Sequence, residues 1–377
     1  MYKLIKKDKN TSARRGQIAT AHGVLEAPFF MPVGTNATVK SVSFEQLREV
    51  EAQIVLSNTY HLFLRPGMDV LNKIGGLHKF MNWDRPTLTD SGGYQVFSLA
   101  KFRKLSDEGV KFQSHHDGSY QFFTPEFVVD IQRAFGTDMM MPLDVCAPYP
   151  CSREEAEESV RLTTLWARRS KDQFLKTQSN DRKQFLFSIV QGATHKDLRE
   201  QSAKELVALD SDAYAVGGVS VGEPVKDMFE ALEWTMPFLP ENKPRYFMGI
   251  GLPDQIVKAV GEGVDMFDTC LPTRMGRHGT AFTKTGRVIL KNAENEKSQM
   301  PIDDQCQCKV CATYSRAYIR HLLRCKETFG MTLVSYHNLY FYINLMKDIR
   351  RAIEEDNYQS FQEEFLRKYR SELVEVK

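Results

Sequence analysis

The chain has 377 residues, of which 42% are hydrophobic and 26% are charged, and its formal net charge is +2. These proportions are typical of a folded globular protein and exclude a disordered, collagen-like or coiled-coil chain. No run approaches the roughly 18 consecutive apolar residues of a membrane-spanning helix. The opening residues MYKLIKKDKN contain no apolar core, so we expect no secretory signal and a cytoplasmic protein.

Short apolar or β-branched segments recur along the chain, and helical patterns lie between most of them. Near-continuous apolar runs are typical of parallel strands that are buried on both faces. Eight such units favour a closed (β/α)8 barrel, the TIM barrel of the α/β class, over an open sheet. The predicted strands are 28–33, 53–57, 86–89, 139–143, 185–190, 213–217, 245–249 and 264–267.

Other signals divide the chain into parts. Ser152 followed by Glu155 is a capping-box pattern, which predicts the start of a helix. The segment 109–124 breaks the strand–helix alternation and predicts a hairpin insertion. We expect a catalytic barrel over residues 1–293, a small appended module over 294–341, and a helix within 342–377 that returns to the barrel.

Polar or small residues stand where strands three to eight are predicted to end. In a (β/α)8 barrel the carboxyl ends of the strands share one rim, and active sites lie there. These residues are Asp90, Asp144, Gln191, Gly217-Gly218, Met248-Gly249 and Asp268. Their convergence predicts an active site at the barrel mouth.

Asp90 in TDSGGYQ and Asp268 in FDTCLPTR are the candidate catalytic groups. Two carboxylates are the minimum for double displacement at a sugar carbon, because one attacks the anomeric carbon and the other moves the proton. The small residues Ser91 to Gly93 let the backbone approach a ligand closely. Each aspartate could instead cap a helix, although Pro272 disfavours a helix directly after Asp268.

A second group of rim residues suits a flat purine. The carboxylate of Asp144 can accept two N–H bonds from a guanine-like edge, and the amide of Gln191 can both donate and accept. Gly217-Gly218 can present bare backbone N–H groups to a carbonyl oxygen, and Tyr94 and Met248 could sandwich the base. Each residue alone could be structural, but together they supply what a purine pocket needs.

The stretch from Thr269 to Ala293 contains no acidic residue and is the sharpest charge asymmetry in the chain. A basic stretch beside a catalytic aspartate fits contacts with a phosphate backbone, and a solvated loop is the alternative. Its basic residues are Arg274, Arg277, Lys284, Arg287 and Lys291.

Seven cysteines without a signal peptide indicate thiols or metal ligands rather than a disulfide framework. Cys306, Cys308 and Cys311 form C-x-C-x-x-C, which predicts a metal site, and zinc is the commonest metal for such ligands. A fourth ligand is missing locally. The candidates are His321, Cys325 and His337.

Taken together, these motifs resemble the bacterial tRNA-guanine transglycosylase family. The matching segments, in family order from about residue 28 to residue 340, are TDSGGYQVFSL, DVCAPYP, VQG, YAVGGVSVGEP, MGIG, DMFDTCLPTR and C-x-C-x-x-C with a distant histidine. The resemblance implies a (β/α)8 barrel with a zinc module inserted before the last barrel helix, and usually a homodimer. It also implies exchange of the wobble guanine of certain tRNAs for a 7-deazaguanine on the way to queuosine.

By resemblance, Asp268 is the nucleophile on the ribose and Asp90 is the general acid/base. The base pocket then comprises Ser91, Tyr94, Asp144, Cys146, Gln191, Gly217, Gly218, Val219, Val221 and Met248, with Tyr94 and Met248 stacking on the base. The resemblance also implies that the tRNA contacts are Arg274 and Arg277, and that the ligands of one structural Zn²⁺ are Cys306, Cys308, Cys311 and His337.

The identity of the inserted base depends on Cys146 and Val221, the pair that the bacterial members carry. This pair implies that the inserted base is 7-aminomethyl-7-deazaguanine rather than the bulkier queuine, because a β-branched Val221 is stiff and fills the end of the pocket. A few positions depart from the usual family pattern and put fine base affinity in doubt, but not the reaction. They are Val145, Ala147, Val219, Ser220 and Thr269-Cys270.

Three other functions compete with base exchange. A non-catalytic tRNA-binding subunit would lack Asp90 or Asp268, and both are present. A zinc hydrolase would need an open metal position at the barrel mouth, but the cysteine-rich segment lies outside the eight-strand region. A ribonucleoside hydrolase differs only in letting water attack the intermediate, and the resemblance decides between the two.

Overall fold

The centre of the molecule is a closed barrel of parallel strands, seen in a computed structural model that describes residues 2–99, 102–178 and 183–369. Within these residues, eight strands pair in the order β4-β14-β13-β12-β11-β10-β6-β5. A parallel bridge between Val33 and Leu56 joins the β4 and β5 sides and closes the ring. The strands are β4 (Phe29–Pro32), β5 (Val55–Asn58), β6 (Thr87–Asp90), β10 (Met139–Met140), β11 (Phe185–Val190), β12 (Ala213–Val216), β13 (Arg245–Phe247) and β14 (Met266–Thr269).

All eight predicted strands are confirmed, and with them the (β/α)8 barrel. The main difference is the fourth strand, which pairs only over Met139–Met140. The backbone N–H of Met141 still donates to the carbonyl of Thr89 at 3.0 Å. Pro142 has no N–H to continue the ladder. The following residues, including Asp144, are therefore free of strand pairing and can turn into the mouth.

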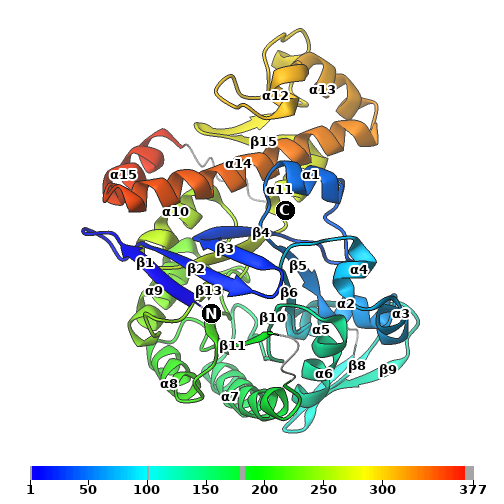
Figure 1. Cartoon of the computed structure of the whole chain (residues 1–377), viewed down its shortest axis with the longest axis vertical. Helices are drawn as coiled ribbons and strands as arrows, with labels where there is room; N and C mark the ends of the chain where they lie inside the picture. The colour runs from blue at the N-terminus through cyan, green and yellow to red at the C-terminus, as the bar shows by residue number, and fades with distance from the viewer. Residues whose placement is uncertain (1, 100–101, 179–182, 370–377) are drawn as a thin grey trace.

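Helices surround the barrel (Figure 1). The capping box predicted at Ser152 is confirmed, since its Oγ accepts the Glu155 N–H at 3.2 Å and the Glu155 carboxylate accepts the Ser152 N–H at 2.8 Å. The helices up to the last strand and just beyond it are α1 (Phe44–Glu49), α2 (Thr59–Leu64), α3 (Met68–Ile74), α4 (Leu77–Met81), α5 (Gly93–Leu99), α6 (Pro125–Phe135), α7 (Arg153–Lys176), α8 (Lys196–Val207), α9 (Val225–Thr235), the 3₁₀ helix η1 (Met236–Phe238), α10 (Pro253–Gly261) and α11 (Leu271–His278).

The barrel interior is a packed core rather than a pore. Its side chains are large and largely unbranched, which suits an irregular space between strands. They include Met31, Leu56, Leu88, Met139, Met141, Phe187 and Met266. Ile18 and Leu25 pack into the same cluster.

Ile18 and Leu25 belong to an N-terminal antiparallel sheet that we did not predict: β1 (Tyr2–Lys7), β2 (Arg14–Thr20) and β3 (Gly23–Ala27). It lies across the barrel in Figure 1. A buried ion pair between Arg14 and Asp265 ties it to the start of β14. The sheet covers the end of the barrel where the strands begin and leaves the opposite end open.

The predicted insertion at 109–124 is confirmed as the hairpin β8 (Gly109–Gln113) and β9 (Tyr120–Phe123), to which β7 (Arg103–Ser106) adds a third antiparallel strand. The indole N–H of Trp166 on α7 donates to the carbonyl of Asp107 at 3.0 Å. This bond fixes the inserted sheet to the outside of the barrel.

After α11 the chain builds a small module and returns to the barrel. Helix α14 (Thr328–Glu354) runs between the two in Figure 1. The Tyr342 ring lies 5.0 Å from that of Phe30, and Arg350 donates to the carbonyl of Pro28 at 2.8 Å. The other elements are β15 (Thr280–Thr283), β16 (Gly286–Ile289), the 3₁₀ helix η2 (Ala293–Asn295), α12 (Lys309–Thr313), α13 (Arg316–Arg324) and α15 (Tyr358–Lys368).

The boundary expected between residues 341 and 342 falls inside α14, so the module and the returning helix share one helix. The division into domains at 293 and 341 stays a prediction. In the part of the chain that the structure describes, no helix combines the length and apolarity needed to cross a membrane.

Candidate active site

The predicted rim residues come together at the carboxyl ends of the strands. Asp90 ends β6 and Asp268 lies in β14, while Gln191 and Gly217 directly follow β11 and β12. Because these strands run parallel in one barrel, their carboxyl ends face the same mouth. The expectation from the strand-end pattern is therefore confirmed in placement.

The carboxylate of Asp90 is held at both oxygens. The amide of Asn58 donates to Oδ2 at 2.5 Å, and the backbone N–H of Thr59 donates to Oδ1 at 3.2 Å. Burial, with a smaller contribution from the charges of Asp268 and Asp144, raises the pKa of Asp90 to about 7, although the two hydrogen bonds lower it. This carboxyl group therefore exchanges protons near neutral pH.

Asp268 is held at one oxygen only. Its Oδ1 accepts the hydroxyl of Tyr246 at 2.5 Å and the backbone N–H of Gly249 at 2.8 Å. Among the described residues, no hydrogen bond reaches Oδ2. Burial raises the pKa of Asp268, and the two donors on Oδ1 lower it. The result is a fixed carboxylate with one unengaged oxygen.

Asp144 forms a second group with its neighbours. The hydroxyl of Ser91 donates to Oδ1 at 3.2 Å, and the amide of Gln191 donates to Oδ2 at 2.8 Å. Burial raises the pKa of Asp144 to about 6, so the group is mostly ionised at neutral pH. A Cβ on Gly93 would stand 2.7 Å from Asp144, so only glycine fits there.

The glycine pair is fitted to Gln191. A Cβ on Gly218, whose φ is +65°, would stand 2.1 Å from the Gln191 Oε1, and a Cβ on Gly217 would meet Ile189 at 2.5 Å. The Oε1 atom of Gln191 is buried and has no partner among the described residues. An unpaired buried acceptor costs stability, so this atom is ready for a donor from a ligand.

Arg199 on α8 lies fully buried behind this pair, and nothing in the sequence pattern pointed to it. Its guanidinium donates to the carbonyls of Ala193 at 2.8 Å, Val190 at 3.1 Å and Gly217 at 2.7 Å. Burial lowers its pKa to about 10, so it stays charged at neutral pH. These bonds fix the carbonyl of Gly217 and with it the orientation of the next peptide.

Three more of the predicted pocket residues are Cys146, Val219 and Val221. Cys146 and Val219 are buried, and burial raises the pKa of the Cys146 thiol to about 12. Glu223 clamps the loop, because its carboxylate accepts the backbone N–H of Ser220 and, at 2.9 Å, that of Val221. The thiol is therefore a neutral wall group rather than a nucleophile.

The two predicted stacking residues lie apart. The sulfur of Met248 lies beside Gly217, and Tyr94 is on α5 with 48% of its surface exposed. No contact between Tyr94 and Met248 is found in the described part of the chain. They were paired because a flat side chain and a polarisable one can each stack on a base. Stacking on opposite faces of a base requires no direct contact between the two residues.

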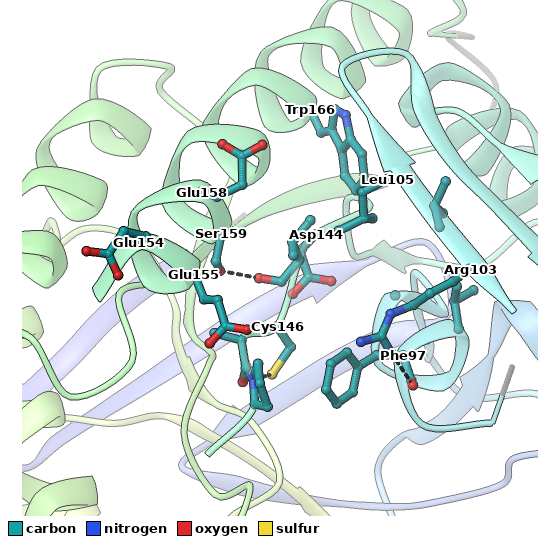
Figure 2. Close-up of a pocket in the computed structure, with 16 residues that line it drawn as sticks. Phe97, Arg103, Leu105, Asp144, Cys146, Glu154, Glu155, Glu158, Ser159 and Trp166 are labelled. Carbon is teal, nitrogen blue, oxygen red and sulfur yellow. Dashed lines mark hydrogen bonds between the residues drawn. The ribbon is translucent and has the colours of Figure 1, made fainter. Parts of the chain in front are cut away.

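A cavity of about 350 Å³ adjoins the group of residues around Asp144. It shares Asp144 and Cys146 with that group, but Asp90, Asp268 and Gln191 do not line it. Figure 2 shows three glutamates of α7 around it: Glu154, Glu155 and Glu158. The cavity is therefore a neighbouring pocket and not the space between the two catalytic candidates.

The basic candidates lie on α11, directly after Asp268. Arg274 is exposed, whereas Arg277 is half-buried and its Nη1 has no partner among the described residues. Burial lowers the pKa of Arg277. A Cβ on Gly276 would stand 2.7 Å from Ser335, so α11 packs tightly on α14 at this glycine.

The cysteine motif meets one of the three candidate histidines. Ligand atoms of Cys306, Cys308, Cys311 and His337 all lie within 4.8 Å of one another. The sulfurs stand 3.7, 3.5 and 3.3 Å from the His337 Nδ1. A tetrahedral zinc ion with usual bond lengths sets such an edge at about 3.5 Å. The residues therefore fit one metal ion.

Several residues that hydrogen-bond to the predicted site residues were not identified from the sequence. Asn58 follows the second strand, and the strand-end rule applied to that strand would have found it. Tyr246 lies within a strand and looks like one more apolar residue. Glu223 stands in the quoted VGGVSVGEP segment but carried no separate signal.

The comparisons with known proteins agree with this arrangement. A family model described as Queuine tRNA-ribosyltransferase matches residues 8–371. The Queuine tRNA-ribosyltransferase of Enterococcus faecalis is 52% identical over 98% of this chain and 96% of its own length. Those of Listeria innocua and Ruminiclostridium cellulolyticum are 54% and 52% identical, over 98% of this chain and 96% and 98% of theirs. The chain therefore belongs to the queuine tRNA-ribosyltransferase family and is a pentosyltransferase.

Proposed function

We propose that the protein exchanges the wobble guanine in the anticodon of certain tRNAs for 7-aminomethyl-7-deazaguanine, by double displacement through a covalent Asp268–ribose intermediate. The observation that carries the proposal is the unequal engagement of the two carboxylates. Asp268 keeps one oxygen without a hydrogen bond among the described residues, and both oxygens of Asp90 are held. One group is arranged to attack, and the other to carry a proton.

In the first step the Oδ2 of Asp268 attacks the anomeric carbon of the ribose, and the glycosidic bond to guanine breaks. The departing base takes a proton from the carboxylic acid form of Asp90. A group with a pKa of about 7 holds that proton on about half of the molecules at neutral pH.

In the second step the deazaguanine gives the proton of its attacking nitrogen to the ionised Asp90 and attacks the same carbon. The ester to Asp268 breaks, and two inversions give net retention. The exchange conserves one glycosidic bond, so no cofactor is consumed. The near-neutral pKa of Asp90 suits both directions of this proton transfer.

The base is read by the second group of residues. The ionised Asp144 accepts from the N–H edge of the base, and the free Oε1 of Gln191 and the backbone at Gly218 take the remaining polar atoms. Ser91, Gly217 and Val219 shape this pocket, and Cys146 and Val221 limit its end. Tyr94 and Met248 cover the two faces of the base. A base in a stacked loop is unreachable, so the anticodon loop must splay it into the mouth.

The remaining parts of the proposal follow from the family and the charge pattern. Arg274 and Arg277 contact the tRNA beside the anticodon, and the protein acts as a homodimer in the cytoplasm. Cys306, Cys308, Cys311 and His337 hold one structural Zn²⁺, since four protein ligands leave no open position. Zinc supplies folding energy there and no step of the exchange.

The test is incorporation of labelled guanine into unmodified tRNA by the Asp268→Asn variant. We expect no incorporation and no denaturant-stable protein–RNA adduct, with tRNA binding retained, because the amide keeps the shape but is a far weaker nucleophile. An adduct in Asp268→Asn would contradict the assignment. If Asp90→Asn alone loses the adduct, the two roles are exchanged.

A ribonucleoside hydrolase is distinguished in the same assay. It would release guanine from tRNA without incorporating the labelled base. Incorporation that equals release supports base exchange, and release alone overturns it.

A further inference from the structure

Three histidines gather at the barrel mouth, outside the groups described so far. His61 lies on α2, and His115 and His116 lie in the turn between β8 and β9. One ring nitrogen from each lies within 4.8 Å of those of the other two. The His115 ring meets that of His61 edge-on at 5.7 Å and that of His116 at 4.0 Å. Two chain segments more than fifty residues apart thus bring three imidazoles together.

Two of the three imidazoles are held in the neutral form. Burial, together with the neighbouring His115 and His116, lowers the pKa of His61 to about 4. Burial and His116 also lower the pKa of His115. Neutral imidazole is the form that binds a metal ion, so the ring nitrogens of His61 and His115 are available near neutral pH.

One of the rings is also oriented from behind. The hydroxyl of Tyr60 lies 2.7 Å from the Nδ1 of His115, and the Tyr60 side chain is fully buried. A histidine ligand usually directs its second nitrogen to such an oxygen, which fixes the ring and its tautomer. The bond leaves the Nε2 of His115 for coordination.

We propose that His61, His115 and His116 form a second metal site, which binds a divalent first-row transition ion of the Zn²⁺ class through three imidazole nitrogens. Three protein nitrogens leave a fourth position open to water or to an oxygen ligand, unlike the closed cysteine–histidine set. Imidazole favours Zn²⁺, Ni²⁺ and Cu²⁺ over Mg²⁺ and Ca²⁺, which take oxygen ligands.

The site has a structural consequence for the mouth. The N–H of His61 donates to the Asn58 side chain at 3.0 Å, and the amide of Asn58 donates to Asp90. A bound ion would tie the β8–β9 turn to the helix whose first residues hold Asp90. Its occupancy therefore bears on the rigidity of the catalytic carboxylate.

A second cluster in the described residues, His22, His78 and Asp138, could compete for an added ion. The two imidazoles stack at 3.6 Å, and both already point at the carboxylate of Asp138. The buried Asp138 also accepts the backbone N–H of Thr87. The oxygens of Asp138 are therefore already engaged within the protein. The experiment must distinguish binding at this cluster from binding at the proposed site.

The test titrates Co²⁺ into the full-length protein with its cysteine–histidine site loaded, and follows both the heat of binding and the visible absorption of a four-coordinate ion. We expect one added Co²⁺. His116→Ala should raise its dissociation constant at least about tenfold, since even an outer partner of a ligand is worth 10–100-fold. His116 is exposed, so the fold should be unaffected.

Two further variants decide between a built site and a chance group of histidines. Tyr60→Phe keeps the buried ring and removes only the hydroxyl, and it should weaken Co²⁺ binding by about tenfold or more. His195→Ala lies outside both clusters and should bind as the unmutated protein does. Unchanged binding in His116→Ala, loss of binding in His22→Ala instead, or no added Co²⁺ at all would overturn the proposal.

Discussion

The hydroxyl of Tyr246 donates to Oδ1 of Asp268 at 2.5 Å, on the same oxygen that accepts the Gly249 N–H. Tyr246 is buried in β13, beside the strand that carries Asp268. Burial raises its own pKa well above the usual value, so it stays a donor over the whole working range. It orients the carboxylate and stabilises its charged form.

Tyr246→Phe should therefore lower the rate and move its dependence on pH. The hydroxyl lowers the pKa of Asp268. Without this hydroxyl the pKa of Asp268 rises. When the solution is acidified, the carboxylate is then protonated at a higher pH than in the unmutated protein. We expect the acid limb of kcat/KM for guanine incorporation to move to higher pH, with a slower rate below it.

Tyr214→Phe is the matched control. Tyr214 is fully buried on the neighbouring strand, and its hydroxyl donates to the carbonyl of Val207 at 3.4 Å rather than to either catalytic candidate. It should leave the pH profile unchanged. The same acid limb in Tyr246→Phe and the unmutated protein would contradict a role of this bond in ionising Asp268.

Arg274→Ala and Arg277→Ala should each weaken tRNA binding and reduce its log–log salt slope by about one. Arg277 should cost more, because its buried Nη1 has no partner among the described residues and a phosphate oxygen would satisfy it. Binding titrations at several salt concentrations measure both effects. Lys226→Ala on α9 is the control, and an unchanged slope in both arginine variants would make the basic stretch a solvated surface.

Removal of the metal should unfold the cysteine-rich module. In the proposed zinc site the binding energy of the metal contributes to the folding of the module, and His337 also joins the site to β15, because its Nε2 lies 2.8 Å from the carbonyl of Phe282. His337→Ala should lower the zinc content measured by elemental analysis, and His321→Ala should not. The reverse pattern would reassign the fourth ligand.

Val221→Gly should raise the use of queuine. If Val221 bounds the base pocket as proposed, its stiff side chain takes the volume that the cyclopentene ring needs. The substitution keeps the backbone N–H of residue 221, which donates to the Glu223 carboxylate, so the loop should stay in place. The unmutated protein should take guanine and the aminomethyl base, and queuine poorly. Competition of both bases against labelled guanine measures this, and equal inhibition by queuine before mutation would contradict it.

Much of the site was predictable because it follows the barrel strands. Runs such as FLFSIV are buried on both faces, and the polar residue after each run lies at the mouth for topological reasons alone. Asp90, Gln191 and Asp268 were found in this way. What each side chain donates to or accepts from was not predictable, because Asn58 and Tyr246 approach from other strands.

Other features depend on local geometry that the order of apolar and polar residues does not reveal. Pro272 was expected to disfavour an immediate helix after Asp268, but α11 begins at Leu271. Proline in the first helical turn lacks only an N–H that would have no partner there, so the expectation was wrong. The charge on Arg199 gave no sign of burial, since its partners are three backbone carbonyls from two separate segments.

The continuity of α14 has a consequence for any attempt to take this protein apart. A chain cut between residues 341 and 342 would sever a hydrogen-bonded helix and separate His337 from Tyr342, one turn apart. Asn338, between them, bonds the backbone of both α11 and β15. The module that carries the cysteine motif is therefore not an exchangeable unit, and a graft between relatives would have to carry the whole of α14 and the barrel surface beneath it.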